Sequence, residues 1–101
     1  MIVVDNSYLA LPGKQQEAIA LFKGLAAFED QRWPLTVPRE VAVDITGETG
    51  RIHMINRKAS LAEHEQHTVE MHADVTFQAF GQQLAALMVP GSFRTVYRRI
   101  V

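Results

Sequence analysis

The strongest constraint on the fold of this chain is a short stretch in which apolar and polar residues alternate. It reads REVAVDIT over residues 39–46, and RIHMINRKA follows over residues 51–59 after the turn sequence GETG. Alternation with a period of two is typical of strands with one buried face, and a glycine-containing turn between two such runs predicts a β-hairpin. The middle of the chain is therefore expected to be an antiparallel strand pair.

The segments before the hairpin are delimited by proline and glycine. Residues 1–11 are mostly β-branched, aromatic or aliphatic and stop at Pro12-Gly13, which predicts a first strand. Residues 14–31 carry apolar side chains at spacings of three and four, which predicts an amphipathic helix. Two prolines in residues 33–38 bias the chain away from helix, so this segment is expected to connect the helix to the hairpin.

Capping residues organise the segments after the hairpin. Ser60 and Glu63 form a capping-box pattern, which predicts a helix through about His72, and Asp74 offers a second N-cap. The helical region is therefore expected to break near residue 73, and a last strand is predicted over residues 92–100. The order βαββαβ predicts one ferredoxin-like α+β domain over residues 1–101, with a four-stranded antiparallel sheet covered by helices on one face.

The predicted pairing of the hairpin places chemically useful side chains on the uncovered sheet face. A turn centred between residues 47 and 50 puts Asp44 opposite His53 and Glu40 opposite Arg57. Because side chains alternate along a strand, the other face is expected to pack on the helices. Its members are Val41, Val43, Ile45, Ile52 and Met54.

These two pairs are the candidate site. A carboxylate beside an imidazole fixes its tautomer, so Asp44 could orient His53 as a general base. Arg57, with Glu40 beside it, could bind an anionic group of a substrate, because the planar guanidinium suits a carboxylate or enolate. The alternative is that both are ordinary cross-strand ion pairs, each contributing about 0.2 to 1 kcal/mol to stability.

A second cluster, HEQHTVEMH over residues 64–72, holds three of the four histidines. On a helix, Glu63, His64, His67 and Glu70 share one arc, whereas His72 points nearly the opposite way. One helix cannot bring the three histidines together, and zinc sites usually need ligands from a second element. The arc is therefore interpreted as a solvated face without a metal, and His72 as a partly buried side chain.

Composition bears on the classes of partner. The formal net charge is −1 and the pI is about 6.4, so no strong nonspecific binding to nucleic acid or anionic membranes is expected. The strand at 51–59 lacks the aromatic residues that stack bases in RNA-binding sheets of this fold. No apolar run approaches the roughly 18 residues of a membrane span, and there is no cysteine, so a cytoplasmic protein is expected. Arg94, Arg98 and Arg99 are interpreted as charges that protect an edge strand.

Several segments together resemble the dimeric α+β barrel proteins and, within them, the NIPSNAP-like branch. They are the segments 8–14, 60–64, 72–74, 90–94 and 96–98. In that superfamily two ferredoxin-like protomers pack their open sheet faces together, and the enclosed space holds a ligand. The resemblance thus implies a homodimer in which the Asp44 and His53 face lines a cavity. The wider superfamily includes cofactor-independent oxygenases, isomerases, dehydratases and haem-degrading enzymes, while NIPSNAP-like members mostly lack an assigned reaction.

The residues and the resemblance together support two hypotheses of function. In the first, the protein is a cofactor-independent homodimeric enzyme of the monooxygenase or isomerase type. His53 abstracts a proton from a small aromatic or carbonyl compound, Asp44 orients His53, and Arg57 steadies the resulting anion. Neither a cofactor nor a metal is needed in this scheme. In the second hypothesis, the same fold serves as a non-catalytic small-ligand-binding or protein-interaction module.

Overall fold

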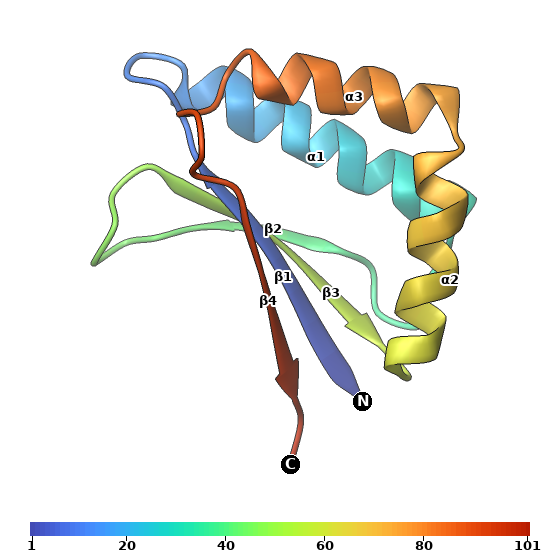
Figure 1. Cartoon of the computed structure of the whole chain (residues 1–101). Helices are drawn as coiled ribbons and strands as arrows, with labels where there is room; N and C mark the ends of the chain where they lie inside the picture. The colour runs from blue at the N-terminus through green and yellow to red at the C-terminus, as the bar shows by residue number, and fades with distance from the viewer.

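The computed structural model describes residues 1–101 and has the predicted ferredoxin-like arrangement (Figure 1). The seven elements are β1 (Ile2–Leu9), α1 (Gln15–Arg32), β2 (Glu40–Val43), β3 (Arg51–Lys58), α2 (Leu61–His72), α3 (Val75–Ala85) and β4 (Arg94–Arg99). The four strands form one antiparallel sheet in the order β2-β3-β1-β4. The central strands are therefore β1 and β3, and the edges are β2 and β4.

The helices all lie on one side of the sheet, as Figure 1 shows. The longest helix, α1, runs beside α3, while α2 leads from the end of β3 to the start of α3. The opposite side of the sheet carries no helix, so the structure has one covered face and one open face. No helix is long and apolar enough to cross a membrane.

The predicted break between the second and third helices is confirmed. Ser60 accepts a hydrogen bond from the backbone N–H of Glu63 at 3.2 Å and begins α2. Asp74 accepts one from the backbone N–H of Phe77 at 2.9 Å and begins α3. Each side chain satisfies a backbone donor that a helix start leaves without an intrahelical partner. The two caps thus divide one helical region into two helices that meet at an angle.

The hairpin register differs from the prediction by two residues. Val43 pairs with Ile52, and the backbone N–H of Asp44 donates to the carbonyl of Arg51, so the connection is longer than the four-residue turn expected. Gly47 and Gly50 both have positive φ angles, of 82° and 92°, and turn the chain twice. A shift of two positions moves partners but keeps every side chain on its predicted face.

The apolar face of the hairpin is only partly buried. Ile52 and Met54 lie in the core beneath the helices, as predicted, and Val41 packs against its edge. The prediction for Ile45 is wrong, because β2 ends at Val43 and leaves Ile45 95% exposed in the loop. Val43 is 40% exposed at the end of this edge strand. The core is therefore centred on β1 and β3, and β2 lies at its edge.

Candidate functional site

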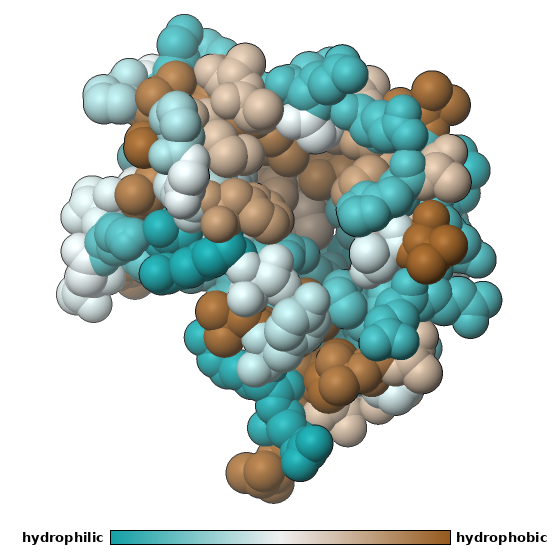
Figure 2. Space-filling view, in the orientation of Figure 1, coloured by the Kyte–Doolittle hydropathy of each residue, from teal (hydrophilic) through white to brown (hydrophobic).

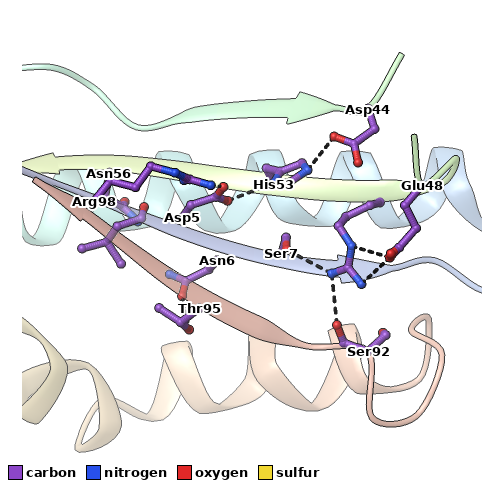
Figure 3. Close-up of polar contacts among 12 residues, drawn as sticks. Asp5, Asn6, Ser7, Asp44, Glu48, His53, Asn56, Ser92, Thr95 and Arg98 are labelled. Atoms are coloured by element: carbon purple, nitrogen blue, oxygen red, sulfur yellow. Dashed lines mark hydrogen bonds and ion pairs between the residues drawn. The ribbon is translucent and has the colours of Figure 1, made fainter. Parts of the chain in front are cut away.

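A row of polar side chains crosses the open face of the sheet (Figure 3). Nδ1 of His53 lies 2.9 Å from Oδ1 of Asp5, and Nε2 lies 2.8 Å from Oδ1 of Asp44. Arg98 donates to the second carboxylate oxygen of Asp5 at 3.2 Å. The row therefore joins β3 to β1 and β4 and to the residue directly after β2. The predicted contact between Asp44 and His53 is present, although the two are diagonal neighbours rather than opposite each other.

The partners of His53 determine its chemistry in this arrangement. A neutral imidazole has one N–H donor, so the ring donates to both carboxylates only when it carries two protons. Neither nitrogen is then free to accept a proton from a ligand. The Asp44 side chain, 29% exposed, follows the end of β2, whereas Asp5 is 11% exposed and held by Arg98. A base role for His53 therefore requires that Asp44 swing away.

The second predicted pair on this face also forms. Arg57 and Glu40 make an ion pair, with side chains 36% and 55% exposed. Water screens such a pair strongly. The sequence prediction did not include Asp5 and Arg98 in the site, because they lie on β1 and β4, outside the hairpin. The alternation that places Asp5 on the same face as Ser7 was the available signal.

A cavity of about 440 Å³ lies on the other side of the sheet, between the sheet and the helices. Figure 2 shows a hollow there, between the helices and β4. Most of its wall is apolar and comes from all three helices and from β3. Among these residues are Phe22, Leu25, Met54, Met71, Phe77 and Leu84.

A few polar groups interrupt this apolar wall. Thr95 of β4 donates its hydroxyl to Oδ1 of Asn6 of β1 at 2.7 Å, which uses the Thr95 donor and leaves the amide N–H groups of Asn6 free. His64 of α2 lines the cavity with Nε2 3.4 Å from the hydroxyl of Tyr97. Glu29, near the end of α1, also lines the cavity. Of these groups, His64 and Glu29 are able to exchange or donate protons near neutral pH.

Glu29 belongs to a buried charged group behind the cavity wall. Its carboxylate lies 3.1 Å from Nε of Arg39, whose side chain is completely buried and also contacts Asp30 at 3.0 Å. Burial raises the pKa of Glu29 to about 7, more than the nearby Arg39 and Lys58 charges lower it. Lys58 is itself only 2% exposed, and burial lowers its pKa to about 8. The cavity wall thus contains an acid that titrates near neutrality, and Lys58, which does not line the cavity, contacts the lining residue His64.

The predicted orientation of the histidine-rich helix is wrong. His64 and His67 face inward and are partly buried, whereas His72 is exposed at the rim of the cavity. Burial lowers the pKa of both His64 and His67, and the charge of Lys58 lowers it further. The histidines of the polar arc turn inward because Lys58 and the Glu29–Arg39 pair give them polar surroundings there, whereas Glu70 stays exposed as predicted.

Two apolar residues of α2 are left outside as a consequence, although Met71 of the same helix is buried. Leu61 is 50% exposed and Val69 is 71% exposed. No three histidine, aspartate or glutamate side chains group in a way that could hold a metal ion. His64 itself is a cavity residue in contact with a lysine.

Comparison with known proteins defines the class to which the fold belongs. A NIPSNAP family protein from Agrobacterium tumefaciens strain C58 superposes with a TM-score of 0.82 at 21% identity, covering 99% of this chain and 92% of its own. An uncharacterised NIPSNAP domain protein from Burkholderia xenovorans gives 0.80 at 12% identity, with 100% and 95% covered. An antibiotic biosynthesis monooxygenase gives 0.71 at 20% identity, with 100% and 99% covered.

The predicted resemblance is therefore confirmed for the fold. The chain has the ferredoxin-like fold of NIPSNAP and antibiotic biosynthesis monooxygenase proteins over essentially its whole length. No protein-family model matches the sequence, and no curated protein does. Since one fold hosts many functions, activity has to be argued from the site itself.

Proposed function

We propose that this protein is a cofactor-independent enzyme that abstracts a proton from a small aromatic or carbonyl compound held between the sheet and the helices. The observation that carries the proposal is the cavity of about 440 Å³, which is mostly apolar but has a titratable carboxyl group in its wall. Ligand pockets commonly measure about 300 to 1,000 Å³ and combine an apolar lining with a few polar groups. The cavity has both properties.

Glu29 is the proposed base in this cavity. A general base works best when its pKa lies near the working pH, and burial raises the pKa of Glu29 to about 7. In the proposed step the C–H bond next to a carbonyl breaks, its proton passes to the Glu29 carboxylate, and the electron pair is delocalised onto the carbonyl oxygen. Arg39 holds the Glu29 carboxylate in place from the side away from the cavity.

The fold relationship with a monooxygenase suggests a fate for the anion that proton abstraction leaves. An enolate can react with dioxygen without a metal. Oxidation of a methylene carbon to a carbonyl then consumes one dioxygen molecule, with one oxygen atom retained in the product and the other released as water. Protonation of the enolate at another carbon would instead give an isomerase. The products distinguish these two outcomes.

The experiment is a search for ligands followed by an assay of turnover. Small aromatic and carbonyl compounds are titrated into isotope-labelled protein, and those that shift the signals of cavity residues are tested for dioxygen uptake and product formation. Glu29→Gln should lower turnover by about 100-fold or more. Glu17→Gln on the exposed side of the same helix should leave turnover unchanged. Binding without turnover would favour a non-catalytic ligand-binding module, and no binding to the cavity would reject the proposal.

The row on the open face supports a second candidate site. The observation that favours this site is the contact of His53 with two carboxylates, those of Asp44 and Asp5. We propose that a second copy of the chain covers this face, as the resemblance to dimeric barrels implies, and that Arg57 and Glu40 then lie at the rim of an enclosed space. Loss of turnover in His53→Ala and Asp5→Asn, with Glu29→Gln active, would place catalysis here, because Asp5 still holds Nδ1 of His53 when Asp44 moves away.

The homodimer itself has a direct test. Sedimentation equilibrium over a range of concentrations measures the molar mass in solution. A stable mass of about twice the chain's 11.3 kDa is the expected result. A persistent monomer would leave the row on the open face in water and remove the second candidate site. The cavity on the helix side lies within one chain, so it does not depend on this outcome.

A further inference from the structure

His64 differs from the other histidines because a lysine engages one of its nitrogens. Nζ of Lys58 lies 3.0 Å from Nδ1 of His64, and the hydroxyl of Tyr97 lies 3.4 Å from Nε2. An ammonium group is a donor only, so Nδ1 must be the acceptor and must carry no proton. In a neutral ring the proton is then on Nε2. Lys58 therefore fixes the tautomer that turns an N–H group toward the cavity side of the ring.

We propose that His64 donates its Nε2–H to an oxygen atom of the ligand, and that Lys58 is the positioning residue that holds it in this state. The inference rests on the proposed function, because it requires a ligand in the cavity. It narrows that ligand to compounds with a carbonyl oxygen that becomes an enolate. The developing negative charge would meet a neutral N–H donor with a buried cation directly behind it.

The surroundings of His64 suit this role. Burial and the Lys58 charge lower its pKa, so the ring stays neutral near pH 7. The contact with Tyr97 is long for a hydrogen bond to oxygen, and Tyr97 is 54% exposed, so a ligand oxygen can replace it at small cost. The Asn6 and Thr95 side chains are already bonded to each other. The amide N–H groups of Asn6 stay free as well, but His64 is the free donor that a buried cation contacts.

The groups around Lys58 keep it charged at pH 7. Glu29 of α1 and Glu63 of α2 face it and raise its pKa, while Arg39 lowers it and burial lowers it most, to about 8. His64 and His67 of α2 are the other titratable groups nearby. With Glu29 in the same cavity wall, the site would take a proton at one point and receive negative charge at another. That combination is what enolisation requires.

The tautomer is tested directly by nitrogen-15 NMR of the histidine rings at pH 7. The expected spectrum shows Nδ1 of His64 unprotonated and Nε2 protonated. In Lys58→Met, which keeps the length of the side chain but removes its charge and donors, the ring should become a mixture of both tautomers. Lys58→Arg, which retains a cation and N–H donors, should restore the original spectrum. A proton on Nδ1 in the parent protein would overturn the inference, whatever any ligand does.

The donation to a ligand is tested with acetophenone and cumene, which have nearly the same shape but differ in the carbonyl oxygen. The ratio of their affinities should fall about tenfold in His64→Phe, which removes one hydrogen bond in a poorly solvated site. Gln66→Phe places the same ring on the exposed side of α2 and should keep the ratio. Circular dichroism verifies that each variant is folded.

The outcomes separate the two proposals. Binding of both compounds with a ratio that His64→Phe does not change would overturn the role of His64 and leave the cavity as a ligand site. Failure of both compounds to bind would count against the cavity itself, and would overturn the proposed function together with this inference. A ratio that falls in His64→Phe and in Lys58→Met, but not in Lys58→Arg, is the result expected.

Discussion

The two faces of the sheet handle polar groups in opposite ways. On the open face, Asp44, His53, Asp5 and Arg98 form a continuous row in which each side chain contacts the next. On the helix side, Nη2 of the buried Arg39 side chain and Nδ1 of His67 have no hydrogen-bond partner. The polar side chains of the open-face row thus find partners within the chain. On the helix side, some buried nitrogen atoms have none.

This difference indicates where a ligand or bound water has most to gain. Buried polar atoms without partners are rare in folded proteins, and each is a place where an additional molecule can be bound. The unpartnered atoms lie near Lys58, since both Arg39 and His67 are electrostatically coupled to it. The helix side therefore holds both the cavity and spare hydrogen-bonding atoms, although Arg39 and His67 lie outside the cavity wall.

Arg39→Met is the strongest test of the contrast between the two faces of the sheet. It should lower the free energy of unfolding by about 3 to 5 kcal/mol. The substitution leaves the buried Glu29 carboxylate without its cation and removes the side-chain contact with Asp30. Urea unfolding followed by circular dichroism measures the change. A loss below about 1 kcal/mol would mean that the buried group tolerates an unpaired charge because water reaches it.

Glu29 gives the next largest effect through the dependence of stability on pH. Its pKa is about 7 in the folded protein against an ordinary value of 4.5, so the folded protein binds more protons between these values. The contribution of Glu29 to stability must then fall as pH rises from 4.5 to 7, by up to about 1.4 kcal/mol per pH unit. Above pH 7 it is constant.

Glu29→Gln isolates this contribution from that of the other titrating groups. Urea unfolding of parent and variant at several pH values gives the difference between their stabilities. Relative to Glu29→Gln, the parent should lose stability between pH 4.5 and 7. A flat difference over this range would show that the Glu29 carboxyl is solvated and would weaken its assignment as the base.

Substitutions at Gly81 have a smaller effect on stability and test whether the ligand occupies the cavity. Gly81 of α3 lines the cavity, and a Cβ placed there meets no atom within 4 Å. Gly81→Ala should stabilise the protein by about 0.5 to 1 kcal/mol through helix propensity and keep acetophenone binding. Gly81→Leu should give a similar gain but abolish binding by filling the space. Unchanged binding in the leucine variant would place the ligand elsewhere.

The smallest effect is expected on the open face at Arg57. Arg57→Met removes an ion pair with Glu40 in which both side chains are substantially exposed. The free energy of unfolding should change by less than about 1 kcal/mol, because water and salt screen such pairs. The same urea experiment measures it beside Arg39→Met. Comparable losses in the two variants would erase the distinction between the two faces.

Local patterns in the sequence were sufficient to predict the elements and their order. The capping residues Ser60 and Asp74 act within a few positions along the chain, so their pattern could be recognised without tertiary information. The faces of the hairpin were also predictable, since a register shift of two residues leaves each side chain on the same face of the sheet. The register itself was not, because the loop is held by Arg51, which binds Glu48 nearby but also the distant Ser7 and Ser92.

The candidate site was less predictable because its contacts join distant parts of the chain. The Glu29–Arg39 and Lys58–His64 contacts are short in sequence but follow no recognisable local pattern. Only the fold brings Lys58 to Glu29 and Tyr97 to His64. The orientation of α2 was predicted wrongly for the same reason. A helix usually buries its apolar arc, but here a buried lysine and an ion pair provide polar surroundings for His64 and His67. Polarity alone does not identify the solvent side when the interior is itself polar.

The joint between α2 and α3 has a consequence for how such a protein could diversify. Asp74 caps α3 and also pairs with Arg32 at the end of α1 at 3.2 Å, yet it does not line the cavity. It therefore helps to set the angle between α2 and α3 without contacting a ligand in the cavity. Substitutions at this joint offer a route by which descendants of the chain could accommodate larger or smaller compounds while His64 and Glu29 stay the same.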